Sequence, residues 1–257
     1  LGAEYRATLE QLPEKERRAY LEGDWDAFEG AVFRLLSGVH LVEPAPIPDH
    51  WPRFRAMDWG FAKPFCVLWG AVDDAGHIHL YREWYGVAKD GRGGFIANEG
   101  ARLEPAVVAE RIAGIEQAAR ETCIGIADPA CWAKGQGDHG GGPSIVEAMR
   151  AHGVHWQAGK NDRLQGKMQV HNRLHHDEHT PPALVIHQAA CPHLVRTLPA
   201  LEYDAHRVED VDTDGEDHAY DALRYLLMAR PWGPAPVKKP DGWRDRRATP
   251  ARNWEWG

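Results

Sequence analysis

The sequence predicts a mixed α/β fold, in which helices flank the faces of a central mixed sheet. Apolar or alternating runs at 53–59, 64–72 and 77–84 predict three strands, and the DDAG turn between the last two predicts a hairpin. Helical and strand-like segments then alternate from 105 to 230. A run of strands followed by alternating units predicts a βββαβαβα order and a mixed sheet.

The later elements follow from their periodicity. Residues 105–120 carry Val108, Ile112 and Ile115 on one face, which predicts an amphipathic helix, whereas the Gly-rich segment 86–100 predicts a loop. Further strands are expected at 123–128, 154–159 and 183–187, and further helices at 143–153, 162–176, 191–204 and 213–230. In the last helix Leu223, Leu226 and Leu227 recur at the spacing of a core-facing stripe.

Three segments are expected along the chain of 257 residues. The Pro-rich stretch 42–52 predicts a boundary, so that 1–48 forms an N-terminal appendage and 49–230 the main domain. Residues 231–257, rich in Pro, Arg and Trp, predict a tail without a core of its own. The missing initiator Met indicates a piece of a longer protein.

Composition limits the class of protein. No window approaches the roughly 18 uninterrupted apolar residues of a membrane helix, so a soluble protein without a membrane partner is expected. The four cysteines are scattered, which favours reduced thiols and a cytoplasmic location. A zinc site of Cys123, Cys131 and His139 is an alternative, although the spacing fits no common structural site. The net charge of −8 does not indicate a nucleic-acid binder, but a local stripe of Lys and Arg could still bind nucleic-acid phosphates.

Two predicted strands end in an acid. Asp58 closes the first strand in AMDWG, and Asp128 ends CIGIAD just before Pro129. Each acid alone is most simply a turn residue. Ligands of open α/β sheets bind beyond the carboxyl ends of strands, so the two acids together indicate a site if their strands are neighbours.

The last helix begins with further acids. Asp217 and Asp221 are four residues apart and share a helix face, with His218 between them. Acids near a helix N-terminus stabilise it by roughly 0.3–1 kcal/mol each, which explains one or two of them without any site. Asp221, however, adjoins the leucine face. If Asp58, Asp128 and Asp221 converge, their repulsion would raise their pKa values unless a cation neutralised them, and oxygen ligands in that arrangement suit Mg²⁺ or Mn²⁺.

The order of elements and three motifs resemble a known family. MDWG on the first strand, IADPA on the fourth and EDHAYDALRY at the last helix resemble the C-terminal nuclease domain of the tailed-phage terminase large subunit. The resemblance covers about residues 50–230 and implies an RNase H-like (retroviral integrase-like) fold. Residues 17–33 also resemble the segment that follows the packaging ATPase in such proteins. The chain has no GxxxxGK[ST] motif, so an ATP-cradling loop is not expected in it.

The resemblance implies a metal-dependent endonuclease that cuts concatemeric viral DNA during genome packaging. Asp58, Asp128 and Asp221 match the positions that bind two metal ions, with Asp217 and His218 as supporting groups. Double-stranded DNA, a portal protein and a small terminase subunit are the implied partners, in the cytoplasm of the host cell. Phosphate contacts are expected from basic residues near the acids, although each is individually more typical of a solvated surface charge; they are Lys134, Lys160, Arg163 and Lys167.

Two alternatives remain open. The DWGFAKPF stretch could be the phosphate-binding turn of an actin-like or sugar-kinase ATPase, but EDHAYDALRY has no role in that class. The chain could also be a non-catalytic module that grips DNA or docks within a packaging motor, with structural acids and a tail that contacts a portal or capsid protein. Nucleotide titration tests the first alternative, and a nicking assay tests the second.

Overall fold

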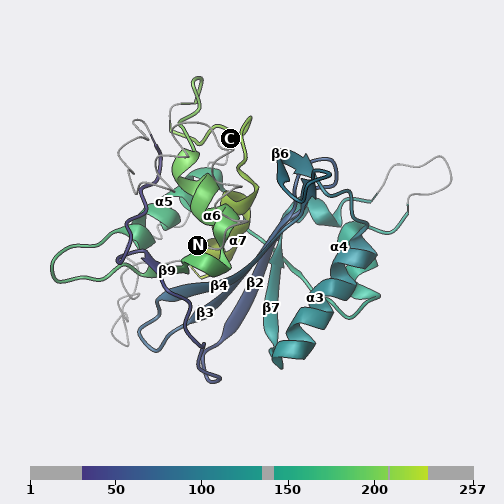
Figure 1. Cartoon of the computed structure of the whole chain (residues 1–257), viewed down its shortest axis with the longest axis horizontal. Coiled ribbons are helices and arrows are strands. Elements are labelled where there is room, and N and C mark those ends of the chain that lie inside the picture. Colours follow the sequence, from purple (N-terminus) through teal and green to yellow (C-terminus); the bar gives the residue numbers. More distant parts are fainter. Residues whose placement is uncertain (1–30, 135–141, 208, 231–257) are drawn as a thin grey trace, which may run out of the picture.

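A single seven-stranded sheet organises the described part of the chain. The computed structural model describes residues 31–134, 142–207 and 209–230. Helices α3 and α4 lie against one side of the sheet, and α5, α6 and α7 lie against the other (Figure 1). The expected mixed sheet flanked by helices is confirmed.

The strand order in the sheet is β1-β9-β4-β3-β2-β7-β8. The bounds are β1 (Leu41–Val42), β2 (Arg53–Asp58), β3 (Cys66–Val72), β4 (Ile78–Tyr85), β7 (Cys123–Ala127), β8 (Gln157–Ala158) and β9 (Leu184–His187). Strands β2, β3 and β4 pair antiparallel, and the pairing of β3 with β4 is the hairpin that the DDAG turn predicted. Strands β7, β8, β9 and β1 join in parallel. The sheet is therefore mixed.

The helices cover both faces because each carries an apolar stripe. They are α3 (Pro105–Ala119), α4 (Ile145–Arg150), α5 (Arg163–Leu174), α6 (Pro192–Thr197) and α7 (His218–Ala229). Val108 and Ile112 of α3 join a cluster with Met57 of β2, whereas Leu223 of α7 joins a second cluster with Ala56. Because consecutive β2 residues point to opposite faces, this strand is buried on both sides.

Helix α7 confirms the expected core stripe. Leu223, Leu226 and Leu227 are at most 1% exposed. The helix begins at His218, with Asp217 as its N-cap residue, five residues later than the start of the predicted segment. The acids at 214–217 therefore lie in and at the end of the preceding loop, while Asp221 lies in the first turn.

The loop predicted at 86–100 is wrong, because this segment forms a separate two-stranded hairpin of β5 (Val87–Lys89) and β6 (Phe95–Gly100). Gly91, Gly93 and Gly94 lie in its turn, where the Asp90 carboxylate accepts hydrogen bonds from the backbone of Arg92 and Gly94. The strand predicted at 154–159 is reduced to β8.

The described part of the N-terminal segment packs on the sheet. Val32, Phe33 and Leu35 are at most 5% exposed, and β1 pairs with β9. The tail at 231–257 lies outside the described residues, and the three-segment division stays a prediction. In the described ranges, no helix has the length and apolar character needed to cross a bilayer.

Candidate active site

Asp58 and Asp128 lie at the ends of neighbouring parallel strands. Met57 of β2 pairs with Ala127 of β7, and the backbone N–H of Asp128 donates to the carbonyl oxygen of Met57 at 3.1 Å. The condition that made the two acids a candidate site, that their strands be neighbours, is thus met. Both carboxyl groups follow the carboxyl ends of their strands, where open sheets bind ligands.

Each of these acids has a distinct local environment. Asp58 is 8% exposed and closes a strand buried by helices on both faces. Asp128 is half-buried and caps a short 3₁₀ helix, Pro129–Trp132, where one carboxylate oxygen accepts from the Ala130 N–H at 2.9 Å. Capping occupies one oxygen of Asp128, which leaves the other able to bind a ligand.

The start of α7 brings a third set of groups to Asp58. The Nδ1 atom of His218 lies 3.3 Å from the Oδ2 atom of Asp58 and 3.9 Å from the Oδ1 atom of Asp217. Helix α7 packs across β2 through its leucine stripe, so its first turn meets the end of that strand. Asp58, Asp217 and His218 therefore form one cluster.

Asp221 is within electrostatic reach of Asp58 but is held by arginines. Its Oδ1 atom lies 3.1 Å from Nε of Arg224 and 3.6 Å from Nη1 of Arg163. Arg163 also donates to Asp210 at 3.0 Å. The negative charge of Asp221 is therefore neutralised by two guanidinium groups in this structure.

Burial and neighbouring charges shift the pKa values of the cluster residues Asp58, Asp217 and His218. Burial raises the pKa of Asp58 to about 7, helped by the charges of Asp221 and Asp217 and opposed by the His218 hydrogen bond. Burial and the charge of Asp221 raise the pKa of Asp217 to about 6. The neighbouring carboxylates raise the pKa of His218, against the effect of burial. A buried group of acids with raised pKa values would bind a cation favourably.

The carboxylate oxygens of Asp58, Asp128 and Asp221 have the chemistry that a hard divalent cation requires. Carboxylate oxygens on separate rigid elements are the ligands that Mg²⁺ and Mn²⁺ prefer. Across the described ranges, however, no three His, Cys, Asp or Glu side chains are already arranged as a metal cage. Metal binding by all three acids would require Asp221 to exchange its arginine contacts for the ion.

The four basic residues expected to contact phosphate lie in different surroundings. Lys134 and Lys160 are exposed, in the segments that follow β7 and β8. Arg163 is engaged with Asp210 and Asp221, and Lys167 donates to the carbonyl oxygen of Glu209 and lies over the Tyr203 ring. The role of all four in DNA binding stays a prediction.

Three residues near the acids were not expected from the sequence. Asn161 accepts hydrogen bonds from Arg224 at 3.1 Å and from the hydroxyl of Tyr225 at 3.3 Å, which fixes the guanidinium beside Asp221. Asn98 of β6 contacts His218 at 3.3 Å. Arg224 could have been found by its i,i+3 spacing from Asp221. Nothing in the sequence pairs Asn98 or Asn161 with α7.

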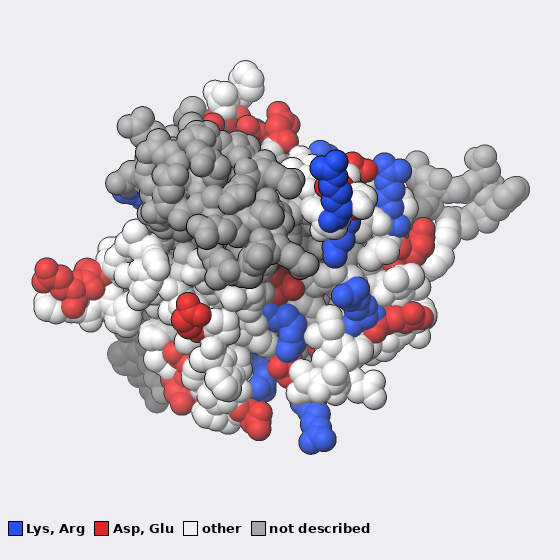
Figure 2. Space-filling view, viewed as in Figure 1, with Lys and Arg blue, Asp and Glu red and all other residues white. Residues whose placement is uncertain are grey.

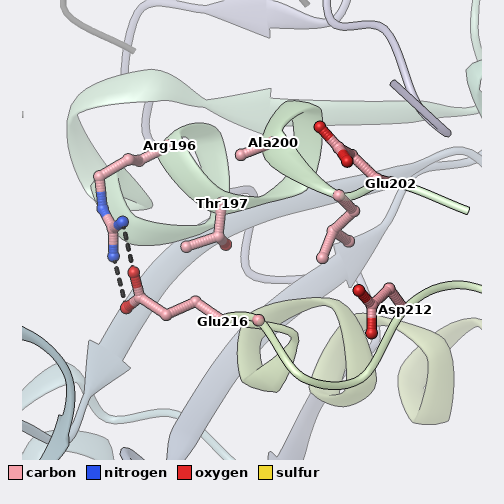
Figure 3. Close-up of a pocket in the computed structure, with 8 residues that line it drawn as sticks. Arg196, Thr197, Ala200, Glu202, Asp212 and Glu216 are labelled. Atoms are coloured by element: carbon pink, nitrogen blue, oxygen red, sulfur yellow. Dashed lines mark hydrogen bonds and ion pairs between the residues drawn. The ribbon is translucent and has the colours of Figure 1, made fainter. Parts of the chain in front are cut away.

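The loop before α7 is fixed by a buried ion pair. Arg196 of α6 donates two hydrogen bonds to Glu216, at 2.6 and 2.7 Å, and the Tyr85 hydroxyl donates a third at 3.2 Å. Figure 3 shows this pair at one side of a pocket of about 280 Å³, with Glu202 and Asp212 at the other side. Because Glu216 directly precedes Asp217, the pair holds the entrance of α7 in place.

The zinc alternative rests on two of the four thiols, Cys123 and Cys131. Cys66, Cys131 and Cys191 are buried and Cys123 is half-buried, and all four are free. Burial raises the pKa of each thiol. His139, the third group of the alternative zinc site, lies outside the described residues.

Known structures share this architecture. The large terminase of a thermophilic bacteriophage matches with a TM-score of 0.60 at 17% identity, over 87% of this chain and 53% of that chain. The nuclease domain of the P22 large terminase matches with a TM-score of 0.55 at 16% identity, over 79% of this chain and 93% of that domain. The chain has the fold of a large terminase nuclease domain.

The similarity of this chain to large terminases is a similarity of fold. A complex of the same thermophilic-phage large terminase with ADP matches at 18% identity and a TM-score of 0.57, over 76% of this chain and 43% of that one. The chain therefore spans about half the length of that large terminase. No protein-family model matches the sequence, and no curated protein matches it.

Proposed function

We propose that this chain is a metal-dependent DNA endonuclease domain of a phage packaging terminase. The observation that carries the proposal is the meeting of Asp58, Asp128 and the start of α7 at one end of two neighbouring parallel strands. The large terminase nuclease fold supports it. The reaction class is hydrolysis of phosphodiester bonds in concatemeric viral DNA.

The acids have two kinds of role in this proposal. Asp58, Asp128 and Asp221 bind Mg²⁺ or Mn²⁺, with two ions as the expected number. Two such ions supply an activated water and stabilisation of the leaving oxygen. Asp217 and His218 hold Asp58 in place, while Arg163 and Arg224 neutralise Asp221 before the ion binds.

A basic groove supports double-stranded DNA as the substrate. Figure 2 shows Lys and Arg side chains gathered over the β6 hairpin and α3 side of one face, with acids among them. A groove of about 740 Å³ is lined by Lys89, Arg102 and Arg111, together with the acids Glu83 and Glu99. Phosphate contacts of this kind make DNA affinity fall as salt rises. Lys134 and Lys160 are proposed to extend the contacts beside Asp128.

The wider setting follows from the same proposal. A terminase nuclease acts in the cytoplasm of the host cell, together with an ATPase motor, a portal protein and a small terminase subunit. These partners and that location rest on the terminase-like fold alone.

A plasmid-nicking assay in Mn²⁺ tests the proposal. We expect Asp58→Ala, Asp128→Ala and Asp221→Ala to lower the nicking rate by more than about 100-fold, a loss at or beyond the upper end for residues that only support a metal ligand. Their far-UV circular dichroism should match that of the wild type. Asp74→Ala is the matched control, because the Asp74 side chain is 83% exposed and away from the cluster. Full activity of Asp128→Ala would sink the proposal.

A non-catalytic DNA-gripping module is the second candidate. The arginine contacts of Asp221 and the lack of a preformed cage within the described ranges favour it. Filter binding of plasmid to the wild type separates the two candidates. Retained DNA binding without any nicking in Mn²⁺ or Mg²⁺ would support the gripping module.

A further inference from the structure

Asn98 holds an uncommon backbone conformation beside the candidate active site. Its φ is 55°, in the left-handed region that non-glycine residues adopt rarely and Asn more readily than most. Within the described ranges, Asn98, Arg102 and Arg120 are the non-glycine residues with positive φ. Such conformations persist where surrounding contacts hold the residue, so the contacts of Asn98 are informative.

Asn98 contacts the start of α7 through its side chain. Its side-chain Oδ1 atom lies 3.3 Å from Nε2 of His218. Against the effect of burial, Arg196 and, less strongly, the nearby Asn98 backbone lower the pKa of Glu216. Glu216 is itself held by Arg196, as Figure 3 shows. The left-handed Asn98 backbone thus places the side-chain amide against the helix that carries the acids.

The side-chain contact decides which nitrogen of His218 faces Asp58. With Nε2–H donating to Oδ1 of Asn98, the other ring nitrogen, Nδ1, faces Oδ2 of Asp58 at 3.3 Å. A histidine ring held at both nitrogens cannot rotate about its bond to Cβ. Without the amide, only the Asp58 contact would restrain the ring.

We propose that Asn98 is a positioning residue, whose amide orients the His218 imidazole against the Asp58 carboxylate and so ties the β5–β6 hairpin to the nuclease centre. Lys89, on the same hairpin, lines the basic groove. The hairpin therefore joins the proposed DNA path to a catalytic acid. The catalytic part of this inference rests on the proposed nuclease function, whereas the geometry of the imidazole can be tested without it.

Three variants separate positioning from backbone strain. Asn98→Gly removes the amide, keeps the backbone N–H and relieves the positive φ, while Asn98→Asp keeps an oxygen acceptor and tolerates the same φ. Arg120→Gly is the matched control. Arg120 has a φ of 54° at the exposed C-terminal end of α3 and contacts none of the acids. Both glycine variants should melt at or above the wild-type temperature.

Two readouts follow each variant. The first is the imidazole Nε2–H signal of His218 in ¹⁵N-histidine-labelled protein without metal, assigned by its absence in His218→Ala. The second is the kcat and KM for plasmid nicking in Mn²⁺. We expect Asn98→Gly to lose the signal and to lower kcat about 10- to 100-fold with KM unchanged. Asn98→Asp should retain the signal, and its kcat should be between that of Asn98→Gly and that of the wild type. Arg120→Gly should match the wild type in both the signal and kcat.

Other outcomes decide against the inference. An Nε2–H signal that survives in Asn98→Gly, or a lost signal with unchanged kcat, overturns the positioning role. A wild-type protein that does not nick DNA overturns the nuclease proposal instead. In that case the His218 signal alone still decides whether Asn98 orients the ring.

Discussion

Asp58 and Glu83 are acids on strands of the same antiparallel part of the sheet, and burial raises the pKa of each to about 7. Their partners differ. Glu83 accepts hydrogen bonds from the backbone N–H groups of His193 and Leu194 at 2.8 and 2.7 Å, so it anchors the start of α6. Asp58 has a histidine and two further acids around it. The same rise in pKa thus occurs in Glu83, which anchors α6, and in Asp58, which is a candidate metal ligand.

The pKa of Glu83 predicts a dependence of stability on pH. Between its ordinary pKa of 4.5 and about 7, the unfolded chain ionises while the folded chain stays protonated, so stability falls as pH rises through this window. Glu83→Gln removes this contribution. Relative to the wild type, the variant should gain up to about 1.4 kcal/mol per pH unit across the window.

Urea unfolding of Glu83→Gln and the wild type at four pH values spread across and just above this window measures the difference. A constant difference in unfolding free energy at all four values would contradict the raised pKa. Glu110→Gln serves as the control, since the Glu110 side chain is 65% exposed.

At the level of single residues, sequence could predict acids but not their partners. Asp58 and Asp128 stand out because each terminates an apolar run, and Asp221 because it adjoins a leucine stripe. The approach of Arg163 and Arg224 to Asp221 depends on how α5 and α7 pack. Asn98 lies 120 residues from His218 in the sequence, and no local pattern links them.

At the level of elements, the packing of α5 against α7 depends on one glycine. A Cβ atom on Gly166 would lie 2.1 Å from Cγ and 2.3 Å from Cδ of Arg224. Arg224 is 1% exposed and directs its guanidinium to Asp221 and Asn161. Gly166 thus leaves room for the side chain that neutralises Asp221, at some cost to helix propensity.

We predict that Gly166→Ala destabilises the protein by about 1–3 kcal/mol, because the added methyl group overpacks the contact with Arg224. Gly114→Ala is the matched control, since Gly114 lies within α3 and a methyl group added there would meet open space. There the same substitution should stabilise by roughly 0.5–1 kcal/mol. Chemical denaturation measures both, and equal stabilisation by the two variants would contradict the close packing.

The elements that sequence predicted are those with a clear period or a strong turn signal. The helix at 105–120 and the strands at 53–59 and 64–72 have long apolar patterns, and each forms close to its expected bounds. The helix at 213–230 ends where expected but begins five residues late, at His218. The β5–β6 hairpin was missed because the glycines in its turn outweighed two short strands. Strand β1 was missed because Leu41 and Val42 adjoin a Pro-rich stretch and pair only with the distant β9.

At the level of the whole molecule, two apolar clusters lie on opposite faces of one sheet. Leu223 of α7 belongs to one cluster and Ile112 of α3 to the other, and both are fully buried. Sequence could predict a mixed sheet with flanking helices. The order β1-β9-β4-β3-β2-β7-β8 depends on crossovers that no local pattern encodes, and this order is what makes β2 and β7 neighbours.

We predict that Leu223→Ala and Ile112→Ala each lower the unfolding free energy by about 2–5 kcal/mol, since each leaves a cavity. Because the sheet separates the two side chains, the losses should add in the double variant to within about 0.5 kcal/mol. Urea unfolding followed by tryptophan fluorescence measures the three variants. A coupling above about 1 kcal/mol would show that the two clusters are not independent.

Convergence of Asp58, Asp128 and Asp221 on a divalent cation is the central claim at this scale. Anomalous diffraction from a crystal soaked in Mn²⁺ tests it most directly. We expect one or two anomalous peaks coordinated by oxygens of all three acids, with Asp221 released from Arg163. Anomalous peaks elsewhere only, or Asp221 still paired with Arg163 and Arg224 at saturating Mn²⁺, would contradict it.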